Sequence, residues 1–212
     1  MKNYEEHINR ILDIIDKVEI GKLTILTGSN GSGKSLIRKQ LCFKLANKVP
    51  SSDYRTITAD VSMQRRTESN LNLGAMGGFM HDDPWNPTSL STFHFMETLF
   101  NTFNKSEGKK RYLIIDEPEI GMSKESQLGF INWFKKQIPS LLENTLGIML
   151  ITHSELIVEQ LKELAVFLNI DKDWTADEWI NREIIPTDFE KLAEESHELY
   201  LAVLNNGKNN DK

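Results

Sequence analysis

The sequence contains only one cysteine, Cys42, so no disulfide bond can form within the chain. A protein without disulfides suits a reducing compartment. No apolar run approaches the ~18 residues that a membrane-spanning helix needs, and the segment 1–7 lacks the apolar stretch of a secretory signal. These absences predict a cytoplasmic protein without membrane insertion.

Basic residues are also fewer than acidic ones: 25 Lys and Arg stand against 31 Asp and Glu, which gives a formal net charge of −6. This balance does not support unassisted binding of nucleic acid or anionic membranes, so nucleic acid is expected only through a partner. The histidines are scattered, and no Cys/His spacing resembles a zinc site. The length predicts a single domain over 1–204, followed by a polar tail at 205–212.

Helix-like and strand-like patterns alternate along the chain. Helices are predicted over 5–17, 35–47, 91–103, 124–137, 154–164 and 188–204, and strands over 23–27, 55–59, 112–115, 147–152 and 166–169. Ser91 would be the N-cap of its helix. Strands separated by helices predict an α/β fold with a mostly parallel sheet flanked by helices. The segment 61–90, which contains several Gly and Pro residues and lies between the predicted strand 55–59 and the predicted helix 91–103, is predicted to be irregular and functional.

A glycine-rich loop follows the first predicted strand, with the sequence Gly-Ser-Asn-Gly-Ser-Gly-Lys-Ser at 28–35. This is the P-loop pattern, in which successive backbone N–H groups turn toward one anion at the positive end of a helix. Lys34 would reach the β- and γ-phosphates of a nucleotide, and Ser35 would ligate Mg²⁺. The alternative is a glycine-rich turn that binds nothing, and the position between a strand and a helix argues against it.

Two further polar motifs come directly after apolar strands. Asp116 and Glu117 end the run Leu-Ile-Ile, which is the Walker B arrangement: Asp116 would hold the magnesium shell and Glu117 would polarise the attacking water. His153 follows the strand Ile-Met-Leu-Ile-Thr and would contact the γ-phosphate or position the water. The alternatives are a solvated acidic turn and a structural histidine. Ligands bind at the carboxyl ends of parallel strands, and this favours the functional interpretation of both motifs.

The sequence Asp-Glu-Pro-Glu at 116–119, followed by His153, resembles the ATP-binding-cassette (ABC) ATPase superfamily. More narrowly, it is similar to the soluble branch that includes mismatch-repair ATPases, SMC-like ATPases and small AAA-type ATPases of phages and defence systems. The resemblance covers residues 20–155. It implies a P-loop NTPase fold of the ABC type, ATP and Mg²⁺ as cofactors, and a homodimer that sandwiches ATP and drives a partner protein.

The resemblance also assigns residues outside the main motifs. It implies that Gln64 is the Q-loop residue, which contacts Mg²⁺ and the attacking water. It also implies that Ser91 is the signature-motif residue, which contacts the ATP held by the partner copy. The segment 120–123 is placed as the loop that crosses the dimer interface. The full predicted site is catalytic Glu117, His153 and Lys34; nucleotide-binding Gly28, Ser29, Asn30, Gly31, Ser32, Gly33, Lys34, Ser35, Gln64 and Ser91; and metal-binding Ser35, Asp116 and Gln64.

The chain departs from the transporter pattern at the signature, where it has Leu-Ser-Thr-Phe at 90–93. The interval from Lys34 to Gln64 is also short for a transporter. Alternatives that stay open are a transporter subunit, a P-loop small-molecule kinase, and a slow regulatory ATPase. A kinase lid usually carries several arginines, and 61–88 contains only Arg65 and Arg66.

Overall fold

The computed structural model describes residues 4–38, 40–41, 58–62, 88–105 and 111–186, together with Asp188, Glu190 and Glu194. Its elements are α1 (Tyr4–Lys17), β1 (Leu23–Thr27), β2 (Thr58–Ser62), α3 (Thr88–Lys105), β3 (Arg111–Asp116), α4 (Lys124–Asn144), β4 (Thr145–Ile151), α5 (Glu155–Leu161), the 3₁₀ turn η4 (Lys162–Leu164), β5 (Ala165–Asn169) and α6 (Ala176–Ile180). A further helix begins at Lys34, after the P-loop, and includes Leu41.

The five described strands form one sheet in the order β2-β3-β4-β1-β5, and every pair of neighbours is parallel. Strand β4 therefore lies between β1, which leads into the P-loop, and β3, which leads into the acidic pair. Because all strands run the same way, their carboxyl ends meet at one edge of the sheet. This edge brings the three predicted polar motifs next to one another.

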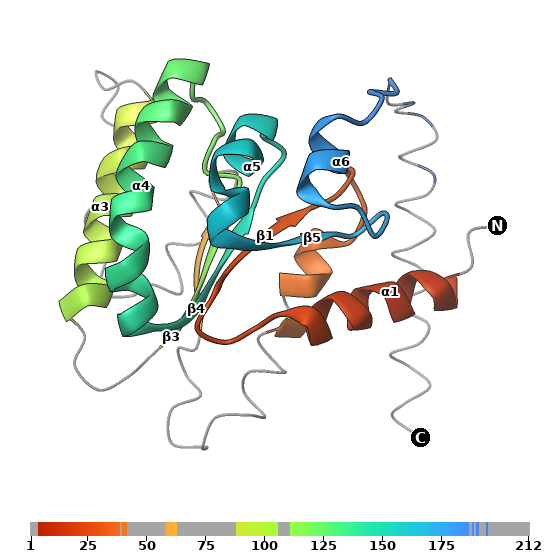
Figure 1. Ribbon diagram of the computed structural model, residues 1–212, viewed down its shortest axis with the longest axis horizontal. Coiled ribbons are helices and arrows are strands. Elements are labelled where there is room, and N and C mark those ends of the chain that lie inside the picture. Colours follow the sequence, from red (N-terminus) through yellow and green to blue (C-terminus); the bar gives the residue numbers. More distant parts are fainter. Residues whose placement is uncertain are drawn as a thin grey trace.

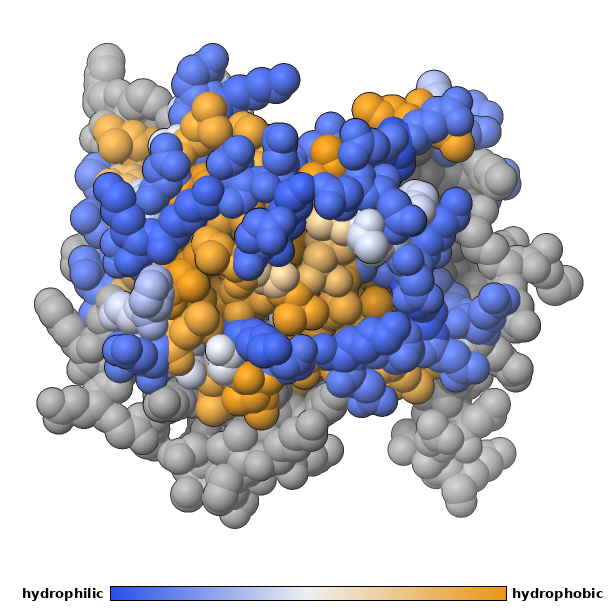
Figure 2. Space-filling view, viewed as in Figure 1, coloured by the Kyte–Doolittle hydropathy of each residue, from blue (hydrophilic) through white to orange (hydrophobic). Residues whose placement is uncertain are grey.

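Helices cover both faces of the sheet (Figure 1). Alternate strand residues such as Ile25 and Leu150 pack against α3, α4 and α5 on one face. Their neighbours Leu26 and Ile151 pack on the other face against α1 and the helix after the P-loop. On the face that Figure 2 shows, hydrophobic residues fill the middle, and bands of hydrophilic residues lie above and below them. Period-two alternation with both faces buried gives a three-layer α/β fold.

Most of the sequence-based elements are confirmed. Strand β1 begins and ends where predicted, and β3, β4, β5, α1 and α5 lie within three residues of their predicted bounds at each end. The predicted closing helix at 188–204 lies outside the continuously described residues. Within the described chain, no helix is both long and apolar enough to span a bilayer.

The structure corrects two predictions around the segment 61–90. The second strand is β2, later than the predicted 55–59, because its position is set by pairing of Thr58 with Tyr112 and of Ser62 with Asp116 rather than by its own β-branched run. Helix α3 begins at Thr88, so Ser91 lies in its first turn and is not the N-cap. Residues 61–62 and 88–90 of the predicted irregular segment therefore belong to β2 and α3, and 63–87 lie outside the residues that the structure describes.

Two helices also differ from prediction. Helix α4 continues through Pro139 to Asn144 instead of stopping at 137. Pro139 is exposed, so water can solvate the carbonyl that loses its intrahelical partner. The short α6 was not predicted, although its capping box of Thr175 and Glu178 is readable in the sequence.

Candidate functional site

The P-loop connects the end of β1 to the following helix through a tight, glycine-dependent turn. Gly31 and Gly33 have φ angles of +76° and +101°, a left-handed conformation that glycine adopts without steric penalty. A Cβ on Gly28 would lie 2.6 Å from the Oγ of Ser32. That Ser32 Oγ is buried and has no hydrogen-bond partner within the described part of the chain. A phosphate oxygen would satisfy this donor, so the loop fits an anionic ligand.

Lys34 folds back over the loop. Its Nζ donates to the carbonyl oxygens of Gly28 at 3.0 Å and Ser29 at 2.9 Å. Burial lowers the pKa of the Lys34 ammonium below its usual value. Nearby carboxylates oppose that shift, with Glu117 the strongest and Asp171 next. The cation thus lies among carboxylates at the carboxyl edge of the sheet, where it could turn toward a phosphate.

Asp116 ends β3 and its side chain is largely buried, at 16% exposure. Its Oδ2 lies 3.5 Å from Nη1 of Arg38, a buried residue of the helix after the P-loop. An opposite charge at this distance favours the ionised carboxylate. Carboxylate oxygens are among the ligands that Mg²⁺ binds, so the chemistry of Asp116 is compatible with the metal role expected for it.

Glu117 has an unusual backbone. With φ at 51°, it is the one non-glycine residue of the described chain in the left-handed region. Its N–H donates to the carbonyl of Ile151 in β4 at 2.8 Å. Its Oε1 lies 3.2 Å from Nε2 of His153, at ion-pair distance when the imidazole is protonated. Strain of this kind gathers at functional sites, where surrounding contacts hold the residue in place.

The loops after β3 and β4 are tied together by Glu119. Its Oε1 accepts hydrogen bonds from the hydroxyl of Thr152 and from the N–H of His153, both at 2.8 Å. Thr152 is fully buried, and its own N–H donates to the carbonyl of Leu26 in β1. The ends of β1, β4 and β3 are therefore linked in one hydrogen-bonded unit.

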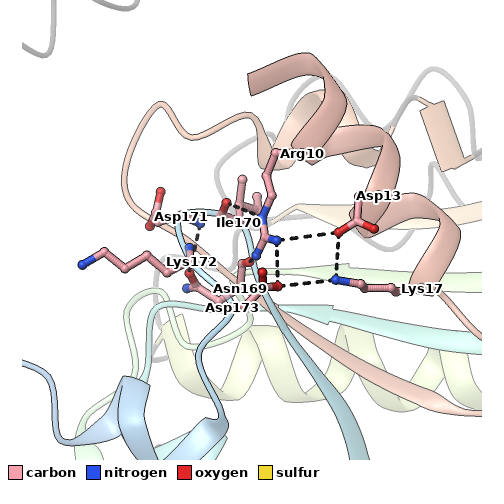
Figure 3. A network of polar contacts seen from close by, with 8 residues as sticks. All are labelled: Arg10, Asp13, Lys17, Asn169, Ile170, Asp171, Lys172 and Asp173. Carbon is pink, nitrogen blue, oxygen red and sulfur yellow. Dashed lines mark hydrogen bonds and ion pairs between the residues drawn. The ribbon is translucent and has the colours of Figure 1, made fainter. Parts of the chain in front are cut away.

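A second network joins α1 to the loop after β5 (Figure 3). The guanidinium of Arg10 donates to the carbonyls of Asn169 and Ile170 and to the carboxylate of Asp173. Asp171, which follows Ile170 in that loop, accepts hydrogen bonds from the N–H and the hydroxyl of Ser29 at 2.6 and 2.9 Å. Helix α1 thus holds the loop that places a carboxylate at the start of the P-loop.

The structure brings together most of the predicted site. The P-loop, Asp116, Glu117 and His153 all lie at the carboxyl ends of neighbouring strands. Gln64 lies outside the described residues, and only the backbone of Ser91 is described, in the first turn of α3.

Four residues of this site were missed by sequence reasoning: Arg38, Glu119, Thr152 and Asp171. Glu119 and Thr152 flank the predicted motifs, so their positions beside the site were readable, but their mutual contact was not. Asp171 lies 142 residues from Ser29 and follows no recognisable motif.

The parallel sheet with helices on both faces and a glycine-rich loop between β1 and a helix define an α/β fold of the P-loop NTPase type. Searches with protein-family models and among curated proteins found no match. Among solved structures, the chain is similar to one in a structure titled "Structure of Drosophila ORC bound to DNA", with a TM-score of 0.42 and 13% identity. The alignment covers 79% of this chain and 42% of that one.

Proposed function

We propose that this protein binds ATP with Mg²⁺ and hydrolyses it. The observation that carries the proposal is the convergence at one sheet edge of a P-loop and a carboxylate–imidazole pair. Lys34 and the orphaned hydroxyl of Ser32 supply donors for phosphate oxygens. Glu117 supplies a carboxylate aimed at the same edge, next to His153.

Each residue of the pair has a distinct task in this proposal. Glu117 accepts a proton from a water molecule that attacks the terminal phosphate, and His153 orients that water or donates to the phosphate. Lys34 leaves the carbonyls of Gly28 and Ser29 to bind the phosphates. Ser35 and Asp116 would hold Mg²⁺, which when bound offsets negative charge on the phosphate oxygens.

The order of strands supports this division of roles. Because β4 lies between β1 and β3, His153 stands between the P-loop and the acidic pair. In this proposal β4 separates the base from the phosphate-binding loop, and the attacking water would lie between them. We favour hydrolysis over transfer to a second substrate because Glu117, beside His153, is placed to accept a proton from water.

The finer part of the proposal is that two copies sandwich two ATP molecules, with Ser91 of each copy completing the other's site. Its support is the resemblance of the motifs to soluble ABC-type ATPases. Dimer formation with ATP and release after hydrolysis would then drive a protein partner. A DNA-repair or phage-defence context belongs to the same resemblance.

The test combines ATP turnover with mass in solution for the wild type and Glu117→Gln, with ATP and Mg²⁺. The proposal expects the variant to lose turnover by about 10²-fold or more and to accumulate as an ATP-dependent dimer. Lys34→Ala, which removes the cation that binds the phosphates, is the control: it should lose turnover as well, but it should not form the ATP-dependent dimer. Wild-type turnover by Glu117→Gln would show that Glu117 is not the base. Loss of turnover without a dimer would retain the ATPase and reject the sandwich.

A further inference from the structure

The carboxylate of Glu119 has no task in the proposed reaction, yet it makes two of the shortest polar contacts at the site. It lies two residues after Glu117 in the turn that follows β3. Its Oε1 accepts from the Thr152 hydroxyl and from the His153 N–H at 2.8 Å each. Both donors belong to the loop after β4, more than thirty residues further along the chain.

These hydrogen bonds hold the loop after β4 in one conformation. The hydroxyl of Thr152 has one proton, which it donates to Glu119, so its oxygen accepts from the N–H of Ser154 at 3.0 Å. Ser154 in turn caps α5 through the N–H of Ile157. Three successive residues, 152–154, are therefore held by a chain of bonds that begins at Glu119.

These bonds also determine the position of the His153 imidazole. Its backbone is held by Glu119, and its Nε2 lies 3.2 Å from Glu117 Oε1. Glu117 itself is fixed to β4 through the carbonyl of Ile151. Two cross-links between the ends of β3 and β4, from Glu119 to His153 and from Glu117 to Ile151, thus hold the two side chains at this distance.

The second oxygen of Glu119 argues against a role limited to stability. Its Oε2 is buried and has no hydrogen-bond partner within the described residues. A buried carboxylate oxygen without a partner is unfavourable for folding, so the contacts of Glu119 are not explained by stability alone.

We propose that Glu119 is a positioning residue that holds His153 beside Glu117 for ATP hydrolysis. The proposal rests on the proposed function for its kinetic consequence, while the geometric part stands on the contacts alone. Glutamine at 119 keeps the accepting oxygen and preserves the arrangement. Alanine at 119 removes the acceptor of the Thr152 and His153 bonds, so the His153 imidazole can move away from the Glu117 carboxylate.

The first readout does not depend on turnover. In the full chain, the ring Cε1–Hε1 signal of His153 is followed by ¹H–¹³C NMR and assigned with His153→Gln. Glu117→Gln should displace this signal, because the carboxylate lies next to the ring. The same substitution in a Glu119→Ala background should displace it less than half as far. An equal displacement in both backgrounds would overturn the proposal.

The second readout is steady-state hydrolysis of ATP. Glu119→Ala should lower kcat by about tenfold to a hundredfold, with KM unchanged within about twofold, and Glu119→Gln should restore most of kcat. Glu143→Ala, an exposed glutamate of α4, is the control. If Glu119→Gln loses as much as Glu119→Ala, the charge and not the position matters, and the proposal fails.

Thr152→Val provides a second variant if Glu119→Ala does not fold. It removes one donor to Glu119 Oε1 and leaves the His153 N–H bond, so the expected displacement and kcat lie between the wild type and Glu119→Ala. Values equal to the wild type would contradict the proposal. A wild type without any ATP turnover would reject the proposed function, while the NMR comparison would still decide the role of Glu119.

Discussion

The imidazole Nε2 of His153 lies 3.2 Å from the carboxylate Oε1 of Glu117, and the two residues follow neighbouring strands, β4 and β3. Glu117 reaches this position with a left-handed backbone, at φ 51°. A residue with a Cβ is destabilised by roughly 1–2 kcal/mol in this conformation. The hydrogen bond from its N–H to Ile151 holds it there. The pairing with His153 is therefore obtained at the expense of backbone stability.

A comparison of Glu117→Gly with Glu117→Ala tests this strain. Both remove the carboxylate, but only glycine adopts φ 51° without a steric penalty, so Glu117→Gly should be the more stable by about 1 kcal/mol. The free energy of unfolding in urea measures the difference. The same pair at Lys136, an exposed residue in the interior of α4, is the control, and there alanine should be the more stable by about 1 kcal/mol. Alanine equal to or better than glycine at 117 would contradict the strain.

The contact of the P-loop with α1 gives a second prediction. A Cβ on Gly33 would lie 2.9 Å from Cδ1 of Ile11, and the φ of Gly33 is +101°. Gly33→Ala should lower the free energy of unfolding by about 1–3 kcal/mol, because backbone strain is added to overpacking. It should also weaken binding of a fluorescent ATP analogue at least about tenfold, since the loop's N–H groups would turn away from the phosphates.

The matched control is Gly129→Ala in α4, where an added Cβ meets no atom within 4 Å. Alanine is the better helix former, so this variant should gain about 0.5–1 kcal/mol and keep nucleotide binding. Gly33→Ala with wild-type stability and binding would show that the loop tolerates a side chain there.

The strands and their motifs were predictable because each carries its own signal. Strand β1 is a short run of Leu, Ile and Thr that ends before Gly28, and its predicted bounds are confirmed. The P-loop, Asp116 and His153 each follow such a run, and topology alone then brings them to one edge. By contrast, the start of β2 depends on its pairing with β3, and the start of α3 at Thr88 is not marked by the serine that suggested a cap.

The contacts that arrange the site could not be predicted from sequence. Asp171 meets Ser29, and Arg10 meets Asp173, only because β5 lies beside β1 and α1 packs across them. The role of Glu119 depends on the register of β3 against β4, which places its turn beside Thr152. Such pairings are fixed by tertiary packing, and a local pattern carries no information about them.

Asp171 provides a test of charge at the mouth of the P-loop. Its carboxylate accepts hydrogen bonds from Ser29, and its charge, after that of Glu117, opposes the lowering of the Lys34 pKa by burial, so it adds negative potential where phosphates would bind. Asp171→Asn should therefore raise the affinity for an ATP analogue several-fold at low salt, and less at high salt because the repulsion is screened. Glu163→Gln, an exposed change of equal charge in η4, is the control and should leave the affinity unchanged. Weaker binding by Asp171→Asn would show that the bond to Ser29 matters more than the charge.

The network of Figure 3 predicts a dependence of stability on pH. The hydrogen bond from Arg10 holds the pKa of Asp173 below its usual 3.8, and the charges of Arg10 and Lys17 add to this shift. A carboxyl with a lowered folded pKa contributes stability above the unfolded pKa, and that contribution disappears as the pH falls through the folded value. In Asp173→Asn the contribution is absent at every pH.

The measurement is the free energy of unfolding of wild type and Asp173→Asn between pH 7 and pH 3. The wild type should be the more stable above about pH 4, and the difference should shrink steadily below it. Glu159→Gln, an exposed acid on α5, should show no such convergence. A difference that stays constant down to pH 3 would mean that Asp173 acts through neutral hydrogen bonding, and that its ion pair with Arg10 does not fix the loop after β5.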